Sequence, residues 1–205
     1  MRSWYRLDID ITSALNKNFR FPLIHNAVPP AATWDGPATG SYILRPRPEE
    51  LLNTEWLETV KSKFNYTLND VVAFYTPASA RYPYAHVDVD LENDSCAIYG
   101  LNFLPFYDTR DMVWYDNEKL KDRKIRQQSP AGTYYDNYPI VDEFLIDRCR
   151  IGKQLTLVRT DIPHRIDDAG HGQAPRLAIS LRPGIPAIKT WEDAVEYFRP
   201  FIIPD

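Results

Sequence analysis

Residues 71–104 decide the fold class, because they contain three short segments with the composition of β-strands. They read VVAFYTPASARYPYAHVDVDLENDSCAIYGLNFL. Each segment is rich in β-branched and aromatic residues and is bounded by Pro, Gly, Asp or Asn, which is typical of strands that end in turns. The three predicted strands are Val71–Thr76, Ala85–Asp90 and Cys96–Leu104.

The same pattern continues toward the C-terminus, where four more segments have strand composition. Seven short strands without regular helices between them indicate an antiparallel sandwich or barrel, and argue against alternating β and α units. The expected fold class is therefore mainly β (α+β), with flanking helices. The four further strands are Met112–Tyr115, Tyr138–Phe144, Leu155–Thr160 and Arg176–Arg182.

A helix is predicted over Pro48–Phe64, where apolar residues recur at every fourth position. Leu52, Trp56, Val60 and Phe64 would lie on one face of such a helix. Proline is favourable at the start of a helix. The N–H groups of the first turn have no partner within the helix, so the N–H that proline lacks is not needed there.

Two other segments have their own character. A second helix is expected over Trp191–Phe198, closed by Pro200. The polar stretch Asp116–Gly132 carries five basic residues and is expected to be a solvated loop or a short helix.

The length of 205 residues suits a single domain, 1–205. Its expected parts are a core at about 71–182, N-terminal strands and a supporting helix in 1–70, and a C-terminal helix and tail in 183–205.

Composition and charge narrow the classes of function. The net charge of −4 argues against a nucleic-acid partner, which usually requires a basic surface. No run of about eighteen apolar residues occurs, so no membrane span is expected, and the charged start MRSWYRLDID does not resemble a signal peptide. The two cysteines, Cys96 and Cys149, are expected to be reduced and packed. A cytoplasmic protein is the resulting expectation.

The segment Tyr84–Asp90 contains the first candidate ligands for a metal ion. Side chains alternate faces along a strand, so His86, Asp88 and Asp90 point to one side while the two valines between them point to the other. This pattern alone is also typical of a half-buried strand with an acidic outer face. Asp90 could support a ligand by a hydrogen bond or could simply face water.

A second histidine strengthens the metal hypothesis. The strand Leu155–Thr160 is followed by Pro163 and His164, which lies 78 residues after His86. Arg176 follows twelve residues later and opens the last strand. Two histidines and one carboxylate form the facial triad of non-haem iron(II) oxygenases, which leaves coordination positions open for other ligands.

These residues resemble the signature of iron(II)/2-oxoglutarate-dependent oxygenases: His86-x-Asp88, the distal His164, and a basic residue about a dozen positions later. The segments 98–105 and 113–115, and the run Pro175–Arg182, resemble the small oxygenases of that superfamily. The likeness extends over about residues 71–182. It implies a double-stranded β-helix, or jelly roll, of the cupin-like kind. It also implies Fe(II), 2-oxoglutarate and O₂ as cofactor and cosubstrates.

The resemblance also assigns residues to the cosubstrate. Arg176 would pair with the far carboxylate of 2-oxoglutarate, because a guanidinium matches a carboxylate with two parallel hydrogen bonds. Many relatives have a hydroxyl residue two positions after this arginine, where this chain has Ala178. Arg182 lies on the same strand face as Arg176 and is a rival for the role. Asn102 would be a polar group near the cosubstrate, and strand parity then excludes Tyr99 from the same face.

The function implied is hydroxylation of a C–H bond, with desaturation or ring formation left open. The expected substrate is an amino-acid-like small molecule or a peptide side chain. Arg81, Arg110 and Arg159 could bind a substrate carboxylate, although exposed arginines are usually only solvated. Two alternatives remain: a metal-free β-sandwich that binds a ligand, and a cupin-type metalloenzyme that does not use 2-oxoglutarate.

Overall fold

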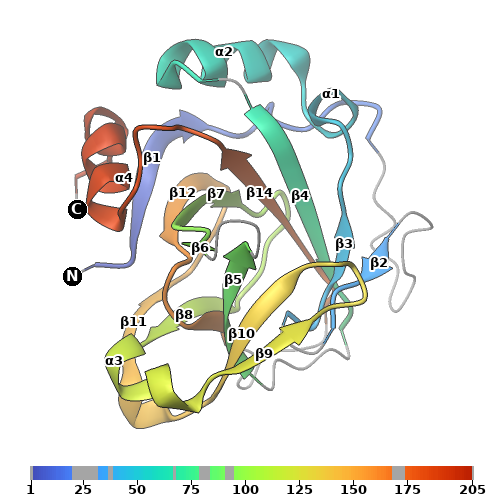
Figure 1. Ribbon diagram of the computed structural model, residues 1–205. Helices are drawn as coiled ribbons and strands as arrows, with labels where there is room; N and C mark the ends of the chain where they lie inside the picture. Colours follow the sequence, from blue (N-terminus) through green and yellow to red (C-terminus); the bar gives the residue numbers. More distant parts are fainter. Residues whose placement is uncertain are drawn as a thin grey trace.

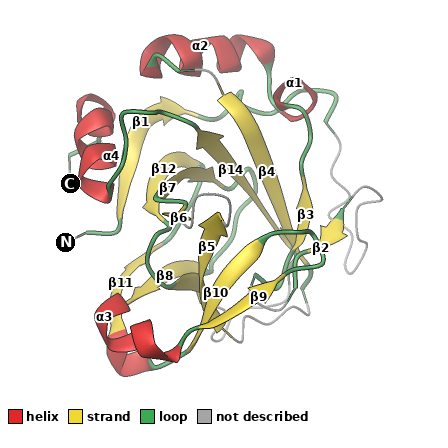
Figure 2. Cartoon of the chain, in the orientation of Figure 1, coloured by secondary structure: helices red, strands yellow, loops and turns green. Residues whose placement is uncertain are grey.

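The computed structural model describes residues 2–19, 32–36, 39–66, 68–78, 84–90, 95–167 and 174–204. These residues form two antiparallel sheets with a few helices at the periphery, as Figures 1 and 2 show. The structure is therefore mainly β and consistent with a β-sandwich, which confirms the expected fold class at this level. None of the helices in these ranges is long and apolar enough to cross a membrane.

The first sheet separates apolar from polar residues by the alternation of its strands. Along its long strand β14, Leu177, Ile179 and Leu181 pack into a hydrophobic core, whereas Arg176 and Arg182 line a pocket on the opposite face. The sheet contains, in spatial order, β1 (Trp4–Asp10), β12 (Gln154–Arg159), β7 (Tyr99–Phe103), β14 (Arg176–Pro183), β4 (Leu68–Thr76), β3 (Tyr42–Leu44) and β2 (Thr33–Trp34).

The second sheet supplies the other wall of that pocket. Residues of both sheets, among them Trp114, Val158 and Ala178, form a smaller apolar cluster. The sheet contains, in spatial order, β11 (Leu145–Cys149), β8 (Asp111–Tyr115), β13 (His164–Asp167), β5 (Tyr84–Asp90), β10 (Tyr134–Pro139) and β9 (Ile125–Gln128), and β6 (Ser95–Cys96) pairs with β5.

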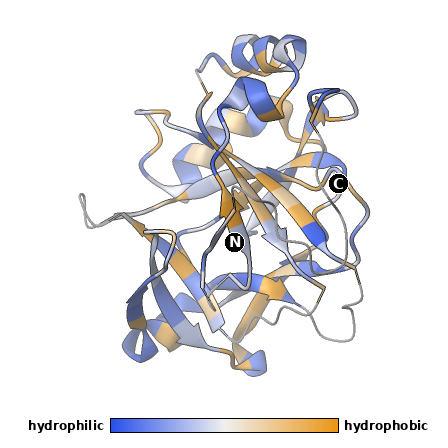
Figure 3. Ribbon diagram, turned by 90° about the vertical axis from the view of Figure 1, so that its right-hand side faces the viewer, coloured by the Kyte–Doolittle hydropathy of each residue, from blue (hydrophilic) through white to orange (hydrophobic). Residues whose placement is uncertain are grey.

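Helices cover the outer face of the first sheet. Trp56, Val60 and Phe64 from α2 and Trp191 and Phe198 from α4 join the main hydrophobic core behind it. Figure 3 shows hydrophobic segments concentrated on the central strands. The α-helices are α1 (Pro48–Leu51), α2 (Thr54–Phe64), α3 (Asn117–Leu120) and α4 (Trp191–Phe198), and short 3₁₀ turns span Lys121–Arg123, Asp142–Phe144 and Arg199–Phe201.

The single helix expected over Pro48–Phe64 was wrong in one respect, since two helices occur there. The break is at Leu52, whose φ of −107° and ψ of 150° are extended. Leu52 is fully buried and forms a bridge with Leu15, so tertiary packing overrides the helical periodicity. Asn53 then begins α2 by accepting a hydrogen bond from the backbone N–H of Trp56.

The strand predicted over Tyr138–Phe144 was also wrong. Strand β10 ends at Pro139, a 3₁₀ turn follows, and β11 begins at Leu145. Proline has no N–H to donate, so it ends the pairing of β10. The polar stretch Asp116–Gly132 contains the short helix α3 but also the strand β9, whose side chains are exposed and carry little strand signal. The other predicted strands and the C-terminal helix are confirmed to within three residues, except that β7 begins at Tyr99 and Ser95–Cys96 forms the separate strand β6.

Candidate metal centre

Two neighbouring strands of the second sheet bring His86, Asp88 and His164 together. His86 is the direct cross-strand partner of His164 in the pairing of β5 with β13. Their ring centroids are 4.6 Å apart. One potential ligand atom from each histidine and from Asp88 lies within 4.8 Å of the others. Because His86 and Asp88 are two positions apart on one strand, both lie on the same face of that strand, as the sequence predicted.

The imidazole of His164 is held in a defined tautomer. Its Nδ1 lies 2.9 Å from the carbonyl oxygen of Ile162, and a carbonyl can only accept, so Nδ1 carries the proton. The lone pair is then on Nε2, the atom left for a metal ion. Burial lowers the pKa of His164 despite the nearby Asp88 carboxylate, which keeps the ring neutral at neutral pH. Ring orientation by a backbone carbonyl is common in histidine metal ligands.

Asp88 is held as a carboxylate by an arginine from the opposite sheet. Arg182 Nη2 lies 2.9 Å from Asp88 Oδ2. Burial opposes ionisation of Asp88, but Arg182 and then the two histidines outweigh it, and its pKa lies below the ordinary value. His86 Nε2 is 3.9 Å from the other carboxylate oxygen. The three side chains therefore present two imidazole nitrogen donors and one anionic oxygen donor.

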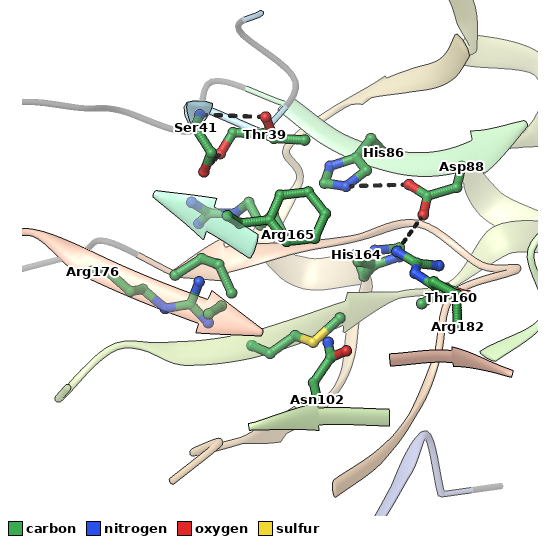
Figure 4. A pocket seen from close by; sticks show the side chains of 14 residues that line it. Thr39, Ser41, His86, Asp88, Asn102, Thr160, His164, Arg165, Arg176 and Arg182 are labelled. Atoms are coloured by element: carbon green, nitrogen blue, oxygen red, sulfur yellow. Dashed lines mark hydrogen bonds and ion pairs between the residues drawn. The ribbon is translucent and has the colours of Figure 1, made fainter. Parts of the chain in front are cut away.

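These groups lie in a pocket between the two sheets, which Figure 4 shows from close by. The histidines are only 8% and 5% exposed, so water has little access to the ligand atoms. Strand β14 contributes one side of the pocket and strand β5 the other. The lining residues are Thr39, Ser41, Phe74, His86, Asp88, Asn102, Met112, Thr160, His164, Arg165, Ile166, Arg176, Ala178 and Arg182.

Arg176 marks the other end of this pocket. It is six residues from Arg182 on β14, so their Cα atoms are separated by roughly 20 Å in a strand of ordinary rise. Arg176 is 6% exposed, and its Nε is 3.3 Å from Oδ2 of Asp108. Asp108 also receives a bidentate contact from Arg110, whose Nη2 lies 2.8 Å away. One acid–arginine pair therefore lies at each end of the pocket.

Small and polar residues lie around Asn102, which lines the pocket. Asn102 and Ser180 are cross-strand partners on β7 and β14, and neither Asn102 Oδ1 nor Ser180 Oγ has a hydrogen-bond partner in the described part of the chain. A Cβ atom at Gly100 would lie 3.1 Å from both of these oxygens. Tyr99 instead lies in the main core and donates to the carbonyl of Pro183, so the prediction that strand parity separates it from Asn102 is confirmed.

Comparisons of the chain with protein-family models, curated proteins and solved structures gave no match.

All six predicted site residues line the same pocket. They are His86, Asp88, Asn102, His164, Arg176 and Arg182. The structure distinguishes the two rival arginines by their acidic partners, because Arg182 pairs with Asp88 and Arg176 pairs with Asp108. Arg110, predicted as a solvated or substrate-binding residue, is 5% exposed and bound to Asp108. Arg81 and the side chain of Asp90 lie outside the described residues.

Sequence reasoning missed Tyr135 and Asp35, which lie beside the candidate metal centre. Tyr135 faces His86 edge-on, with ring centroids 5.1 Å apart, and its hydroxyl donates to the buried carboxyl of Asp35. Ser129 donates to the same carboxyl at 2.9 Å. Asp35 is separated from Tyr135 by 100 residues, and no local pattern marks either of them. The position of Tyr135 follows only from its pairing with Asp88 across β10 and β5.

Proposed function

We propose that this chain is an Fe(II)- and 2-oxoglutarate-dependent oxygenase that hydroxylates a C–H bond of an amino-acid-like small molecule or a peptide side chain. The single observation that carries the proposal is the cluster of His86, Asp88 and His164, whose ligand atoms lie within 4.8 Å of one another in a buried pocket. Two imidazoles and one carboxylate are the ligand set of the facial triad, which suits iron(II).

The order of the strands supports a double-stranded β-helix for the core. Strands β4, β5, β7 and β8 alternate between the first and second sheets along the chain, and so do β11, β12, β13 and β14 in the reverse sense. The two sheets then contain interleaved strands from both halves, β12-β7-β14-β4 in one and β11-β8-β13-β5 in the other. In this topology, β9 and β10 are an insertion between the halves.

The donor set fits a ferrous ion for three reasons. The tautomer of His164 directs a lone pair at Nε2, since Nδ1 donates to the Ile162 carbonyl. Asp88 is anionic, because Arg182 compensates the cost of its burial. The three ligands come from one side, strands β5 and β13 of the second sheet, which leaves the side toward the first sheet for other ligands.

Arg176 is the better of the two arginines for the far carboxylate of 2-oxoglutarate. Arg182 is already engaged with the Asp88 carboxylate, at 2.9 Å. Arg176 lines the opposite end of the same pocket, so we propose that it pairs with the cosubstrate carboxylate that points away from the metal. The small Ala178, in place of the hydroxyl residue of many relatives, leaves room along β14 between the two ends. Asn102 would offer its amide to the cosubstrate from the neighbouring strand.

The chain's own residues perform binding, orientation and exclusion of water. His86, Asp88 and His164 would hold the ion, Arg176 would fix the far end of the cosubstrate, and apolar walls would keep water out. When bound, the ferrous ion supplies the chemistry that activates O₂, with conversion of 2-oxoglutarate to succinate and CO₂. The apolar lining consists of Phe74, Met112, Ile166 and Ala178.

The proposal is tested by loading the protein with Fe(II) without oxygen and then adding 2-oxoglutarate. We expect one iron per chain and a visible charge-transfer absorption on addition of the keto acid. With O₂, succinate should form, and mass spectrometry of amino-acid and peptide libraries should reveal a product that gains one oxygen atom from isotopic O₂. His86→Ala and Asp88→Ala should lose iron while keeping the wild-type circular dichroism.

Asp111→Asn is a matched control, because Asp111 pairs with Arg148 and Arg150 and is not among the pocket-lining residues. It should bind iron like the wild type. Iron binding without any response to 2-oxoglutarate would favour a cupin-type metalloenzyme. Absence of iron binding by the wild type would favour a metal-free binding module instead.

A further inference from the structure

The charges at the Arg176 end of the pocket form a buried cluster. Arg110, Asp108 and Arg176 have side chains that are 5%, 6% and 6% exposed. Taking an arginine out of water is costly unless an anion compensates it. Asp108 is the anion that contacts both guanidinium groups, so the three side chains together carry one net positive charge.

Asp108 is fixed in place without Arg176. Its Oδ1 accepts from the backbone N–H of Arg110 at 2.8 Å and from Arg110 Nε at 3.0 Å. Arg110 Nη2 also donates to the carbonyl of Ala174, at 3.1 Å, and thereby ties the loop before β8 to the start of β14. The carboxylate is therefore a rigid reference point beside Arg176.

The contact with Asp108 is made by one edge of the Arg176 guanidinium. A guanidinium has two edges that can meet a carboxylate, one containing Nε and the other containing the two terminal nitrogens. The Nε atom is the one that lies 3.3 Å from Asp108. Figure 4 shows Arg176 among the side chains that line the pocket.

We infer that Asp108 is a positioning residue, which orients the guanidinium of Arg176 to receive the far carboxylate of 2-oxoglutarate. This inference rests on the proposed function. Asp108 does not act as a competitor for Arg176, because Arg110 alone already matches its charge. The ion pair with the rigid Asp108 would hold the long Arg176 side chain in place before the cosubstrate binds, so that this side chain need not be ordered on binding.

The test measures equilibrium binding and not turnover. Fe(II)-loaded wild type and Asp108→Asn are titrated with 2-oxoglutarate without oxygen, and the charge-transfer absorption gives Kd. We expect the Kd of the variant to rise about tenfold, which corresponds to about 1.4 kcal/mol for the loss of the buried ion pair that holds Arg176. The Kd for iron should stay unchanged, because Asp108 lies at the other end of the pocket. Asp111→Asn should match the wild type in both constants.

A double-mutant cycle separates positioning from a general structural role. If Asp108 acts through Arg176, Asp108→Asn should change the Kd for 2-oxoglutarate little when Arg176 is already Gln. Asp108→Glu keeps the charge and serves as the second variant if Asp108→Asn does not fold. We expect it to bind iron normally and 2-oxoglutarate more weakly than the wild type.

Three results would overturn the inference. An unchanged Kd in Asp108→Asn, or in Asp108→Glu where that variant is the one measured, would show that Arg176 needs no orientation. A lower Kd would show that Asp108 competes with the cosubstrate. Equal losses in the presence and absence of Arg176 would show a structural effect. Failure of the wild type to respond to 2-oxoglutarate would instead count against the proposed function itself.

Discussion

At the scale of single residues, Arg182 and Asp88 are the pair that most changes the interpretation of the sequence. Both were site candidates, but their contact across 94 residues was not predicted. The sequence left Arg182 as an alternative to Arg176 for binding 2-oxoglutarate. In the structure, Arg182 instead compensates the charge of Asp88, a candidate metal ligand. Its role should therefore be visible in metal binding and not in cosubstrate binding.

Arg182→Gln should weaken Fe(II) binding by about 10- to 100-fold, the usual cost of removing a partner of a metal ligand. The pKa of Asp88 would rise without its main cation, so protons would compete better with the metal. Isothermal titration with Fe(II) or Mn(II) without oxygen measures the effect. A variant that binds metal normally but loses affinity for 2-oxoglutarate would return the cosubstrate role to Arg182.

Asp35 provides a second prediction at this scale. Burial raises its pKa to about 6, although hydrogen bonds from Tyr135 and Ser129 oppose the shift. The folded pKa is above that of the unfolded chain, so this group's contribution to stability is full below about pH 4 and is lost as the pH rises through 6. The loss amounts to about 2 to 3 kcal/mol in the free energy of unfolding.

Asp35→Asn should remove that pH dependence. The free energy of unfolding of the variant minus that of the wild type should grow by about 2 to 3 kcal/mol as the pH rises from 4 to 7.5, because only the wild type loses stability in this range. Denaturant unfolding at several pH values measures the difference, with Asp70→Asn, at a half-exposed side chain, as the control. Parallel pH profiles for wild type and Asp35→Asn would contradict the prediction.

At the scale of elements, strand β7, which pairs with β14, has little room for a side chain at one position. Gly100 is that position, since a Cβ atom there would be 3.1 Å from Asn102 Oδ1 and Ser180 Oγ. Such a contact is tighter than most, and a branched residue would push the strands apart. The glycine therefore allows two polar side chains to share the space above it.

Gly100→Val should reduce the free energy of unfolding by about 1 to 3 kcal/mol, the usual cost of overpacking. Gly184→Val is the matched control, because nothing lies within 4 Å of its Cβ position. Chemical denaturation of both variants tests the prediction. Equal stability of the two would mean that Asn102 and Ser180 can move aside without cost.

At the scale of the whole molecule, the pocket lies between the two sheets and is lined by residues of both. The candidate metal ligands come from β5 and β13 in the second sheet, and the arginines come from β14 in the first. A ligand that binds only the folded form stabilises it by mass action. Metal and cosubstrate together would therefore hold the two sheets against each other.

Mn(II), as a redox-stable substitute for iron, should raise the free energy of unfolding by about 2.7 kcal/mol at a hundred times its Kd. Removal by a chelator should reverse the gain, and His164→Ala should abolish it. 2-Oxoglutarate should add further stability when the metal is present. Thermal unfolding monitored by circular dichroism measures these shifts, and a metal-independent midpoint would count against the site.

The sequence by itself determined the strand-rich fold class and the candidate ligands, because those features depend on local order. Alternation puts His86 and Asp88 on one face of a strand whatever the strand's neighbours are. The same rule separated Asn102 from Tyr99. Helix α2 was likewise visible as periodic apolar residues, although the break at Leu52 depended on packing, and helix α4 was expected before Pro200.

Only the tertiary structure decided which charges meet. Arg182 reaches Asp88, and Arg176 reaches Asp108, a residue 68 positions earlier in the chain. Ion pairs between distant residues depend on how strands cross between the sheets, and composition or periodicity along one strand does not encode that crossing. The ion-pair partners of the site residues could therefore not be predicted from the sequence, because they are brought together by the arrangement of the strands and not by closeness along the chain.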